Sequence, residues 1–216
     1  MRKHLRIMIG LLLTVVLFAS AFVLTVDVKA EVPDVQELAE YTQYLHSGDI
    51  WHFIIVHNNS TKHLTIMTNT VAYDATGGVS GADTGYYDDL APGCDGLIIE
   101  QIDCISKPVS YQTQFSSKKS VIVEDSTPYV IVQTNVSDDH KKVVATFTNI
   151  GTVPASQFDI VVLFMKGTQV LDYSYAMPVD LDGELKPGYT LSDTVSYDYS
   201  ENPDNVLIFP QGCHYN

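Results

Sequence analysis

The sequence predicts an all-β protein made of two tandem Greek-key β-sandwiches that follow an N-terminal export segment. Three observations lead to this prediction. The chain of 216 residues is a series of short β-rich runs separated by turn-forming residues. One pattern of runs and turns is written twice, about 90 residues apart. The first thirty residues form an apolar segment with a basic start.

Residues 1–30 are typical of a secretory signal or of an uncleaved membrane anchor. Three cations lie within residues 2–6, and residues 7–26 are apolar apart from two threonines and a serine. A stretch of this length can just span a bilayer. Small-residue cleavage sites follow at 28–30 or at 19–21. Under either alternative the protein is secreted or extracytoplasmic, and it contacts a membrane only through residues 1–30 if they stay uncleaved.

Charge and cysteine content exclude some functions. The formal net charge is -14, and it becomes -17 without residues 1–30, because that segment holds four cations and one acid. Such a domain is repelled by nucleic acid and by anionic lipid, so we expect no nucleic-acid partner. Cys94, Cys104 and Cys213 are an odd number of cysteines, so at least one has no partner within the chain.

The repeated pattern joins an asparagine at the end of a β-rich run to two later turns. In the first copy the elements are Asn58, the turn ending at Gly77, and Leu90-Ala91-Pro92-Gly93. In the second copy they are Asn149, the turn ending at Gly167, and Leu185-Lys186-Pro187-Gly188. The offsets are 91, 90 and 95 residues. Solenoid repeats are far shorter, so this spacing predicts a duplicated domain.

The repeat sets the expected boundaries. Residues 48–120 and 124–216 are predicted to be separate sandwiches. Residues 31–47 lie outside the repeat and are predicted to form a short helix or a stalk. A capping-box-like start at Asp34 precedes apolar residues that are spaced as one helical face as far as Leu45.

Three motifs of the first copy resemble the FxLYD-type and related immunoglobulin-like domains of bacterial secreted proteins. These are Val56-His57-Asn58, Tyr73-Asp74-Ala75-Thr76-Gly77 and Leu90-Ala91-Pro92-Gly93. The second copy departs from the second motif, since Leu163-Phe164 stands in place of Tyr-Asp. The resemblance implies two extracytoplasmic immunoglobulin-like sandwiches without catalytic residues.

The sequence predicts no metal centre. His46, His52, His57 and His63 lie close together, but strand alternation places His52 and His57 on opposite faces. We expect these four histidines to be surface or half-buried strand residues. The acidic stretches 83–89 and 180–184 are expected to be solvated loops, because the remaining ligands of an EF-hand are missing. Calcium binding by these stretches is left open as the alternative.

The sequence also predicts no enzyme and no cofactor. There is no Gly-x-Ser-x-Gly and no papain-like cysteine context, and the adjacent acids Asp88 and Asp89 would face opposite ways on a strand. The predicted function is a non-catalytic extracytoplasmic surface or binding module whose partner is a protein or glycan at the cell surface. An accessory protein of a secreted hydrolase is a less favoured alternative.

Tyrosines are the candidate ligand-binding residues, because their rings offer flat apolar area with a hydrogen-bonding tip. The candidates are Tyr86, Tyr87, Tyr173, Tyr175, Tyr197 and Tyr199. The first two are expected in an exposed loop, and each later pair on one strand face. A carbohydrate-binding module is the alternative favoured if these tyrosines form an exposed ridge. The competing interpretation is that they are half-buried residues covering the core.

Overall fold

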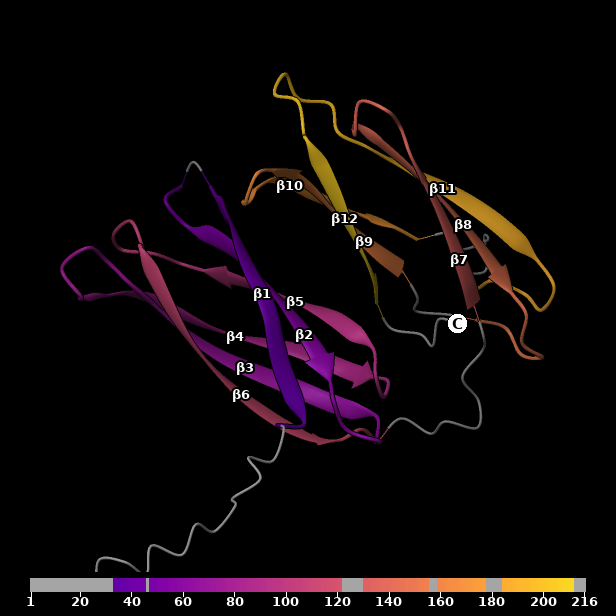
Figure 1. Ribbon diagram of the computed structural model, residues 1–216, viewed down its shortest axis with the longest axis horizontal. Helices are drawn as coiled ribbons and strands as arrows, with labels where there is room; N and C mark the ends of the chain where they lie inside the picture. The colour runs from indigo at the N-terminus through magenta and orange to yellow at the C-terminus, as the bar shows by residue number, and fades with distance from the viewer. Residues whose placement is uncertain (1–32, 46, 122–129, 156–158, 178–183, 212–216) are drawn as a thin grey trace, which may run out of the picture. The chain divides into compact units, whose positions relative to one another are not determined.

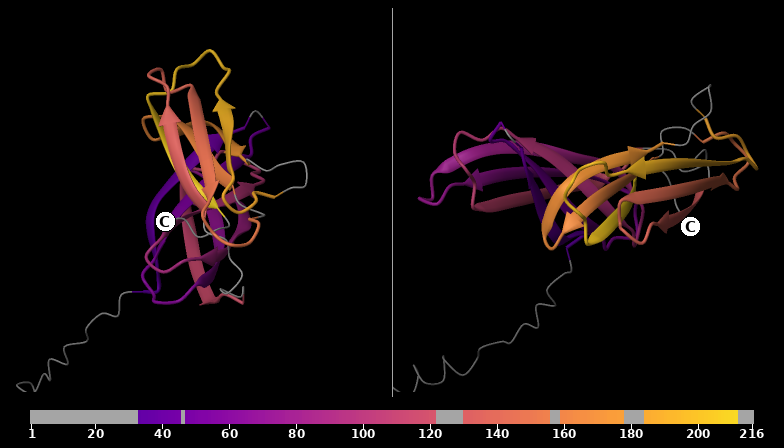
Figure 2. Two further views of the ribbon diagram at one scale, coloured as in Figure 1. Left: turned by 90° about the vertical axis from the view of Figure 1, so that its right-hand side faces the viewer. Right: turned by 90° about the horizontal axis from the view of Figure 1, so that it is seen from above.

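The computed structural model describes residues 33–45, 47–121, 130–155, 159–177 and 184–211. Within these residues the chain forms strands and loops and no helix, which confirms the prediction of an all-β protein (Figures 1 and 2). None of the described segments is therefore a helix that could span a membrane. The apolar segment 1–30 lies outside the described residues, and its role in export stays a prediction.

The first six strands form two facing antiparallel layers. In one layer β2 pairs with β1 and β5, and in the other β3 pairs with β4 and β6. Side chains from both layers meet in one core, where Ile54 and Ile98 pack with Ile66. The strands are β1 (Val35–Tyr44), β2 (Ile50–Asn58), β3 (Leu64–Tyr73), β4 (Val79–Leu90), β5 (Asp95–Ile102) and β6 (Ser110–Lys119).

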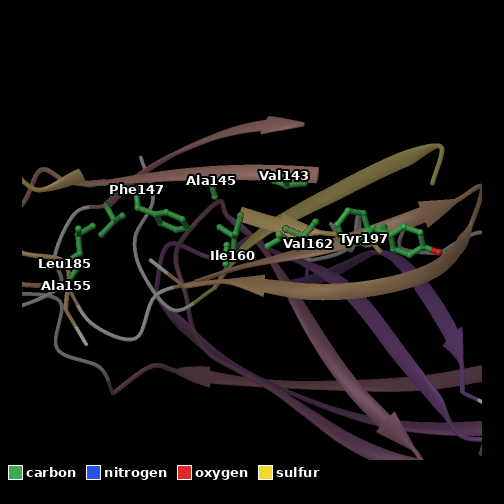
Figure 3. Packing of buried hydrophobic residues seen from close by; sticks show 12 residues of the cluster. Val143, Ala145, Phe147, Ala155, Ile160, Val162, Leu185 and Tyr197 are labelled. Carbon is green, nitrogen blue, oxygen red and sulfur yellow. The ribbon is translucent and has the colours of Figure 1, made fainter. Parts of the chain in front are cut away.

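The last six strands repeat this pairing. β8 pairs with β7 and β11, and β9 pairs with β10 and β12, so each strand has the partners of the strand six places earlier. Figure 3 shows Val143 and Phe147 of β8 pointing toward Ile160 and Val162 of β9 in the core of this half. The strands are β7 (Val130–Val136), β8 (Lys142–Asn149), β9 (Asp159–Lys166), β10 (Gln169–Ala176), β11 (Thr190–Ser196) and β12 (Asn205–Gln211).

The period of two in the sequence decides which side chains enter these cores. In β8, buried residues alternate with more exposed ones along the whole strand. β9 is instead apolar at every position between its charged ends, β2 carries an apolar run from Phe53 to Val56, and both strands are buried on both faces. Continuous apolar runs of this kind are typical of strands covered on both sides.

The second faces of β2 and β9 take part in another core, which joins the two halves. Phe53 and Ile55 of β2 pack there with Val161 and Leu163 of β9, and Val170 of β10 joins them. All five side chains are at most 8% exposed. The halves thus bury apolar surface against each other, whereas the sequence predicts two separate sandwiches.

A continuous sheet accompanies this shared core. β1 and β10 pair in parallel at Thr42 and Gln169, and Nε2 of Gln43 donates a hydrogen bond to the carbonyl oxygen of Leu171 at 2.9 Å. The resulting strand order is β12-β9-β10-β1-β2-β5. The edge strands β5 and β12 of this sheet are also in contact.

The helix predicted within residues 31–47 is wrong, because Val35–Tyr44 is strand β1. A helix of about ten residues is marginal in water without tertiary support. As a strand, the segment pairs with β2 at nine positions. It also turns Ala39 and Tyr41 toward the shared core. Tertiary pairing therefore outweighs the local capping signal at Asp34.

Asn58, the last residue of β2, explains one half of the repeated motif. Its side chain is fully buried. Nδ2 donates to the carbonyl oxygens of Lys62 and Leu90, both at 2.8 Å, and Oδ1 accepts the backbone N–H of Ser60 at 2.9 Å. One amide therefore ties the end of β2 to the next loop and to the leucine of Leu-x-Pro-Gly.

Asn149 makes the same contacts in the second half. Nδ2 donates to the carbonyl oxygens of Val153 and Leu185, both at 2.8 Å, and Oδ1 accepts the N–H of Gly151 at 2.8 Å. The asparagine and the leucine of the sequence repeat are thus partners in one hydrogen-bond network that occurs twice.

The glycines of the repeat occupy corresponding turns. Gly93 and Gly188 have φ angles of 70° and 75°, and each donates its N–H to the carbonyl oxygen of the buried asparagine, at 2.9 and 2.8 Å. Gly77 and Gly167 lie in the β3–β4 and β9–β10 turns with φ angles of 81° and 57°. Positive φ strains residues other than glycine, which accounts for glycine at these points.

Candidate functional site

The exposed face of the sheet β4-β3-β6 is the best candidate for a binding surface. Alternation along β3 sends Leu64, Ile66 and Thr68 into the core and leaves the residues between them on the other side. We name this side the outer face of the first sheet. Its residues are Thr65, Met67, Asn69 and Val71 of β3, Ala82, Thr84, Tyr86 and Asp88 of β4, and Gln112, Gln114, Ser116 and Lys118 of β6.

The register of the strands arranges these residues in rows. Met67 lies between Tyr86 and Ser116, and the next row consists of Thr84, Asn69 and Gln114. Oγ1 of Thr84 donates a hydrogen bond to Oδ1 of Asn69 at 3.2 Å. The rows present hydroxyl and amide groups, with charged residues only at the Asp88 and Lys118 end.

A pocket of about 320 Å³ opens on this face. The ring of Tyr86, which is 60% exposed, and the side chain of Met67 supply its apolar part. The rest of the lining is polar and consists of Thr65, Asp88, Ser116, Ser117 and Lys118. An aromatic ring among hydroxyls and single charges suits either a sugar ring or a polar segment of a protein.

The local backbone fixes the direction of Tyr86. Between Leu64 and Ile66 the pairing of β3 with β4 shifts, so that β4 accommodates an extra residue there. Bulges of this type re-aim neighbouring side chains. Oγ1 of Thr65 donates to the carbonyl oxygen of Asp88 at 2.8 Å and secures the shifted segment. The pocket therefore lies on a rigid strand rather than on a loop.

Tyr87 does not share this surface. The prediction that Tyr86 and Tyr87 both lie in an exposed loop is wrong, since both belong to β4 and alternation sends them to opposite faces. Tyr87 is 8% exposed and packs in the core with Ile98.

The remaining candidate tyrosines do not reach this pocket. Tyr197 is 5% exposed and packs on Phe164, with ring centroids 5.3 Å apart, so it belongs to the core of the second half. Tyr173 is half-buried and meets Trp51 edge-on at 5.4 Å. Tyr175 and Tyr199 are exposed, but they lie in other parts of the second half. Of the six candidates, Tyr86 lines the pocket.

Sequence reasoning missed the other pocket residues, although a signal for them exists. Thr65 and Met67 alternate with buried residues in a run that reads as a strand. Ser116 and Lys118 follow the same period in β6. What the sequence does not give is the register, which places these residues beside Tyr86.

The three described histidines of the group lie in two different settings, and His46 is outside the described residues. His57 and His63 are partly buried and face Asp95 and Asp89, at 2.6 and 3.3 Å. The expectation of a surface or half-buried position is wrong for His52, which is fully buried. Across the described ranges, no group of His, Cys, Asp and Glu residues could hold a metal ion.

The prediction that the acidic stretch 83–89 is a loop is wrong, because these residues belong to strand β4. Asp83 accepts the backbone N–H of Gln101 at 3.0 Å, so this carboxylate caps a neighbouring strand. Of the stretch 180–184, only Glu184 is among the described residues.

Cys94 and Cys104 are free thiols in the first half, and Cys213 lies outside the described residues. Burial raises the pKa of both described thiols, and the neighbouring Asp95 raises that of Cys94 further. A raised pKa lowers the thiolate fraction at neutral pH and makes these cysteines poor nucleophiles.

Comparison with known proteins adds no function. No family model matches the chain, and no curated protein matches it. Among solved structures the chain is similar to red sea bream transglutaminase, with 14% sequence identity and a TM-score of 0.26. The match covers 83% of this chain and 29% of that chain, so this chain spans less than a third of that structure. A likeness at this TM-score carries no argument about fold or activity.

Proposed function

We propose that this protein is a non-catalytic, extracytoplasmic binding module that binds its ligand through the outer face of the first sheet. The observation that carries the proposal is the pocket around Tyr86. It combines an exposed aromatic ring with hydroxyl groups and two charged side chains, on the face of a β-sheet. Surfaces of this type bind by contact area and hydrogen bonds, and they need no activated nucleophile.

The proposed architecture is a tandem pair of immunoglobulin-like Greek-key sandwiches that arose by duplication. The repeated strand pairing and the twin networks of Asn58 and Asn149 support it. The proposed location outside the cytoplasm is supported by the basic and apolar residues 1–30. N-terminal sequencing of the exported protein tests this part, since we expect the mature chain to begin after Ala30.

A carbohydrate ligand is the second candidate function, and a specific observation bears on it. Tyr86 lies on β4, Tyr175 on β10 and Tyr199 after β11, and of these three exposed tyrosines Tyr86 lines the pocket. Support for a glycan comes from the pocket itself, where one ring shares the lining with the hydroxyl groups of Thr65, Ser116 and Ser117.

Binding to arrays of cell-surface glycans and to cell-surface protein fractions tests the proposal. The chain carrying Tyr86→Ala should bind at least about tenfold more weakly than the unchanged chain, because a tyrosine at the centre of an interface contributes about 1.4 kcal/mol or more. Tyr199→Ala is the matched control, since Tyr199 is 63% exposed and lies outside the pocket. Equal binding by both variants would contradict the proposed face, and turnover of any bound glycan or peptide would contradict the non-catalytic function.

A further inference from the structure

His52 and Glu100 form a buried pair in the core of the first half. They lie opposite each other on β2 and β5, and they are 0% and 1% exposed. Nδ1 of His52 is 3.1 Å from Oε2 of Glu100. Nε2 of His52 is 3.2 Å from Oε2 of Glu40 on β1, whose side chain is 42% exposed. One imidazole thus connects a buried carboxylate with one that reaches solvent.

The hydrogen bonds around the pair assign its protonation state. The backbone N–H of Gly85 donates to Oγ1 of Thr68 at 3.1 Å, so the Thr68 hydroxyl donates its own hydrogen to Oε1 of Glu100 at 2.5 Å. Both oxygens of Glu100 then accept hydrogen bonds, which fits a carboxylate. Each ring nitrogen of His52 faces a carboxylate oxygen, and only an imidazolium donates from both nitrogens.

The second half shows that the fold does not require this ion pair. Val143 precedes Asn149 by six residues, as His52 precedes Asn58. Val195 follows Gly188 by seven residues, as Glu100 follows Gly93. Val143 and Val195 are buried and lie directly opposite each other. An apolar pair therefore occupies the corresponding place.

The first half is shaped around the pair. A Cβ atom on Gly85 would collide with Cγ2 of Ile98 and lie 2.8 Å from Oγ1 of Thr68 and 2.9 Å from Cγ of Glu100, so both the apolar core and the pair need glycine there. A buried ion pair is often no more stabilising than well-packed apolar residues, but removing one partner leaves an uncompensated charge. A pair that stability does not require, and that the core accommodates, can serve as a device sensitive to charge.

The position of the pair determines what it can control. Through Glu40 it holds β1, the strand that pairs with β10 and binds the second half through Gln43. The other titratable groups that face His52 are Glu37 of β1 and Tyr111 of β6, whose ring stacks on the imidazole at 4.7 Å. β3 contributes the neutral Thr68.

We propose that the His52–Glu100 pair is a pH-sensitive lock in the core of the first half, which adds a side-chain tie between β2 and β1, through Glu40, to their backbone pairing. The lock is complete while Glu100 is ionised and His52 is protonated. Protonation of Glu100 in acid leaves the buried imidazolium with the partly exposed Glu40 as its only carboxylate neighbour of the two, and loss of the His52 proton in base leaves the buried Glu100 carboxylate without its cation. A neutral imidazole donates from one nitrogen only, so it no longer holds Glu100 and Glu40 together, and β1 keeps its backbone pairing with β2 but loses this side-chain tie.

Thermal unfolding of the full chain between pH 4 and pH 9 tests the lock. The double variant His52→Val/Glu100→Val copies the Val143–Val195 pair and should fold. The Tm of the unchanged protein should fall by several degrees on both sides of a maximum, relative to the double variant at the same pH. His52→Val alone should lower the Tm at neutral pH, because Glu100 then stays charged without a partner. Parallel Tm profiles of the unchanged and double-variant proteins would overturn the proposal.

A second measurement locates the effect. Amide hydrogen exchange of β1, corrected for the intrinsic effect of pH, should accelerate at least about tenfold at the acid limit in the unchanged protein, while β8 stays protected. If the double variant does not fold, Glu100→Gln replaces it. Since a neutral amide no longer favours the imidazolium, the pH of maximal Tm should move. An unchanged maximum, or acceleration in β8 as great as in β1, would contradict the lock.

Discussion

The sheets β4-β3-β6 and β10-β9-β12 occupy the same place in the two halves, yet their outer faces differ. The first is polar, open and hollowed by the pocket at Tyr86. The second presents Val161, Leu163 and Met165, which are at most 1% exposed because the face of β2 and β5 covers them. One strand framework therefore supports either a free surface or an internal interface, and the residues at alternate positions decide which.

The covering sheets show the reverse difference. In β2 the outward positions Phe53 and Ile55 are apolar and buried by the second half. In β8 the corresponding face carries Thr146 and Thr148, whose hydroxyls lie 2.9 Å from those of Ser192 and Thr190 on β11. In each half, therefore, one sheet has a polar outer face and the other sheet has an apolar outer face that is buried in the shared core.

Truncation on the two corresponding faces should give the largest contrast. Leu163→Ala should lower the free energy of unfolding by about 2–5 kcal/mol, because it leaves a cavity in the shared core. Met67→Ala on the open face should cost about 1 kcal/mol or less, since Met67 is only partly buried. Chemical denaturation measures both values. Equal losses would mean that the shared core does not contribute to stability.

Removal of the buried asparagines should affect the halves alike. Asn58→Ala and Asn149→Ala each remove the side-chain donor of two carbonyl oxygens. We expect each to lower the free energy of unfolding by about 1–3 kcal/mol. Ser60→Ala is the control, because it keeps the asparagine and removes only the Ser60 hydroxyl. A large effect in one half alone would argue against a common network.

A carboxyl at the start of β9 sharpens the contrast through pH. Burial raises the pKa of Asp159 to about 6 from the ordinary value of 3.8. The folded protein therefore binds this proton more tightly than the unfolded chain, and the associated stability is lost as the pH rises between about 4 and 6. Asp159→Asn should raise the Tm at pH 7 and leave it unchanged at pH 3.5. An equal rise at both values would assign the effect to packing rather than charge.

The smallest expected effect concerns the two cysteines of the first half, Cys94 and Cys104, and their rates of reaction with a thiol reagent measure it. In a Cys213→Ser chain, Cys94 and Cys104 should react much more slowly than an unfolded peptide thiol at pH 7.5, because burial raises the pKa of both. After unfolding, both should react with a thiol reagent. Resistance after unfolding would indicate a disulfide between them.

The sequence allows part of this structure to be predicted, where the signal is local. The run of alternating residues in β8 and the turns at Gly93 and Gly188 depend on neighbours in the chain, and the sequence shows them directly. The all-β class follows from such signals. Local signals do not predict that residues 35–44 form strand β1, because this segment is made a strand by its pairing with β2 and not by the capping residue Asp34.

The candidate site depends on long-range register, which the sequence does not contain. Tyr86 could be singled out as a candidate, but its neighbour Ser116 lies thirty residues away and reaches it only through the pairing of β3 with both β4 and β6. His52 and Glu100 can be noticed in the sequence, since each is a titratable residue inside an apolar run. Their meeting across β2 and β5 is again a matter of register.

The shared core also determines what happens to the molecule when its backbone is cut. A protease site introduced between Val121 and Val130 would sever the covalent connection but leave β1 beside β10 and the packing of Phe53 against Leu163 in place. The two fragments should elute together and separate only in denaturant. Expressed alone, either fragment would display a large apolar sheet face and tend to aggregate. We therefore expect that the two halves can be transferred to another protein only together, as one unit.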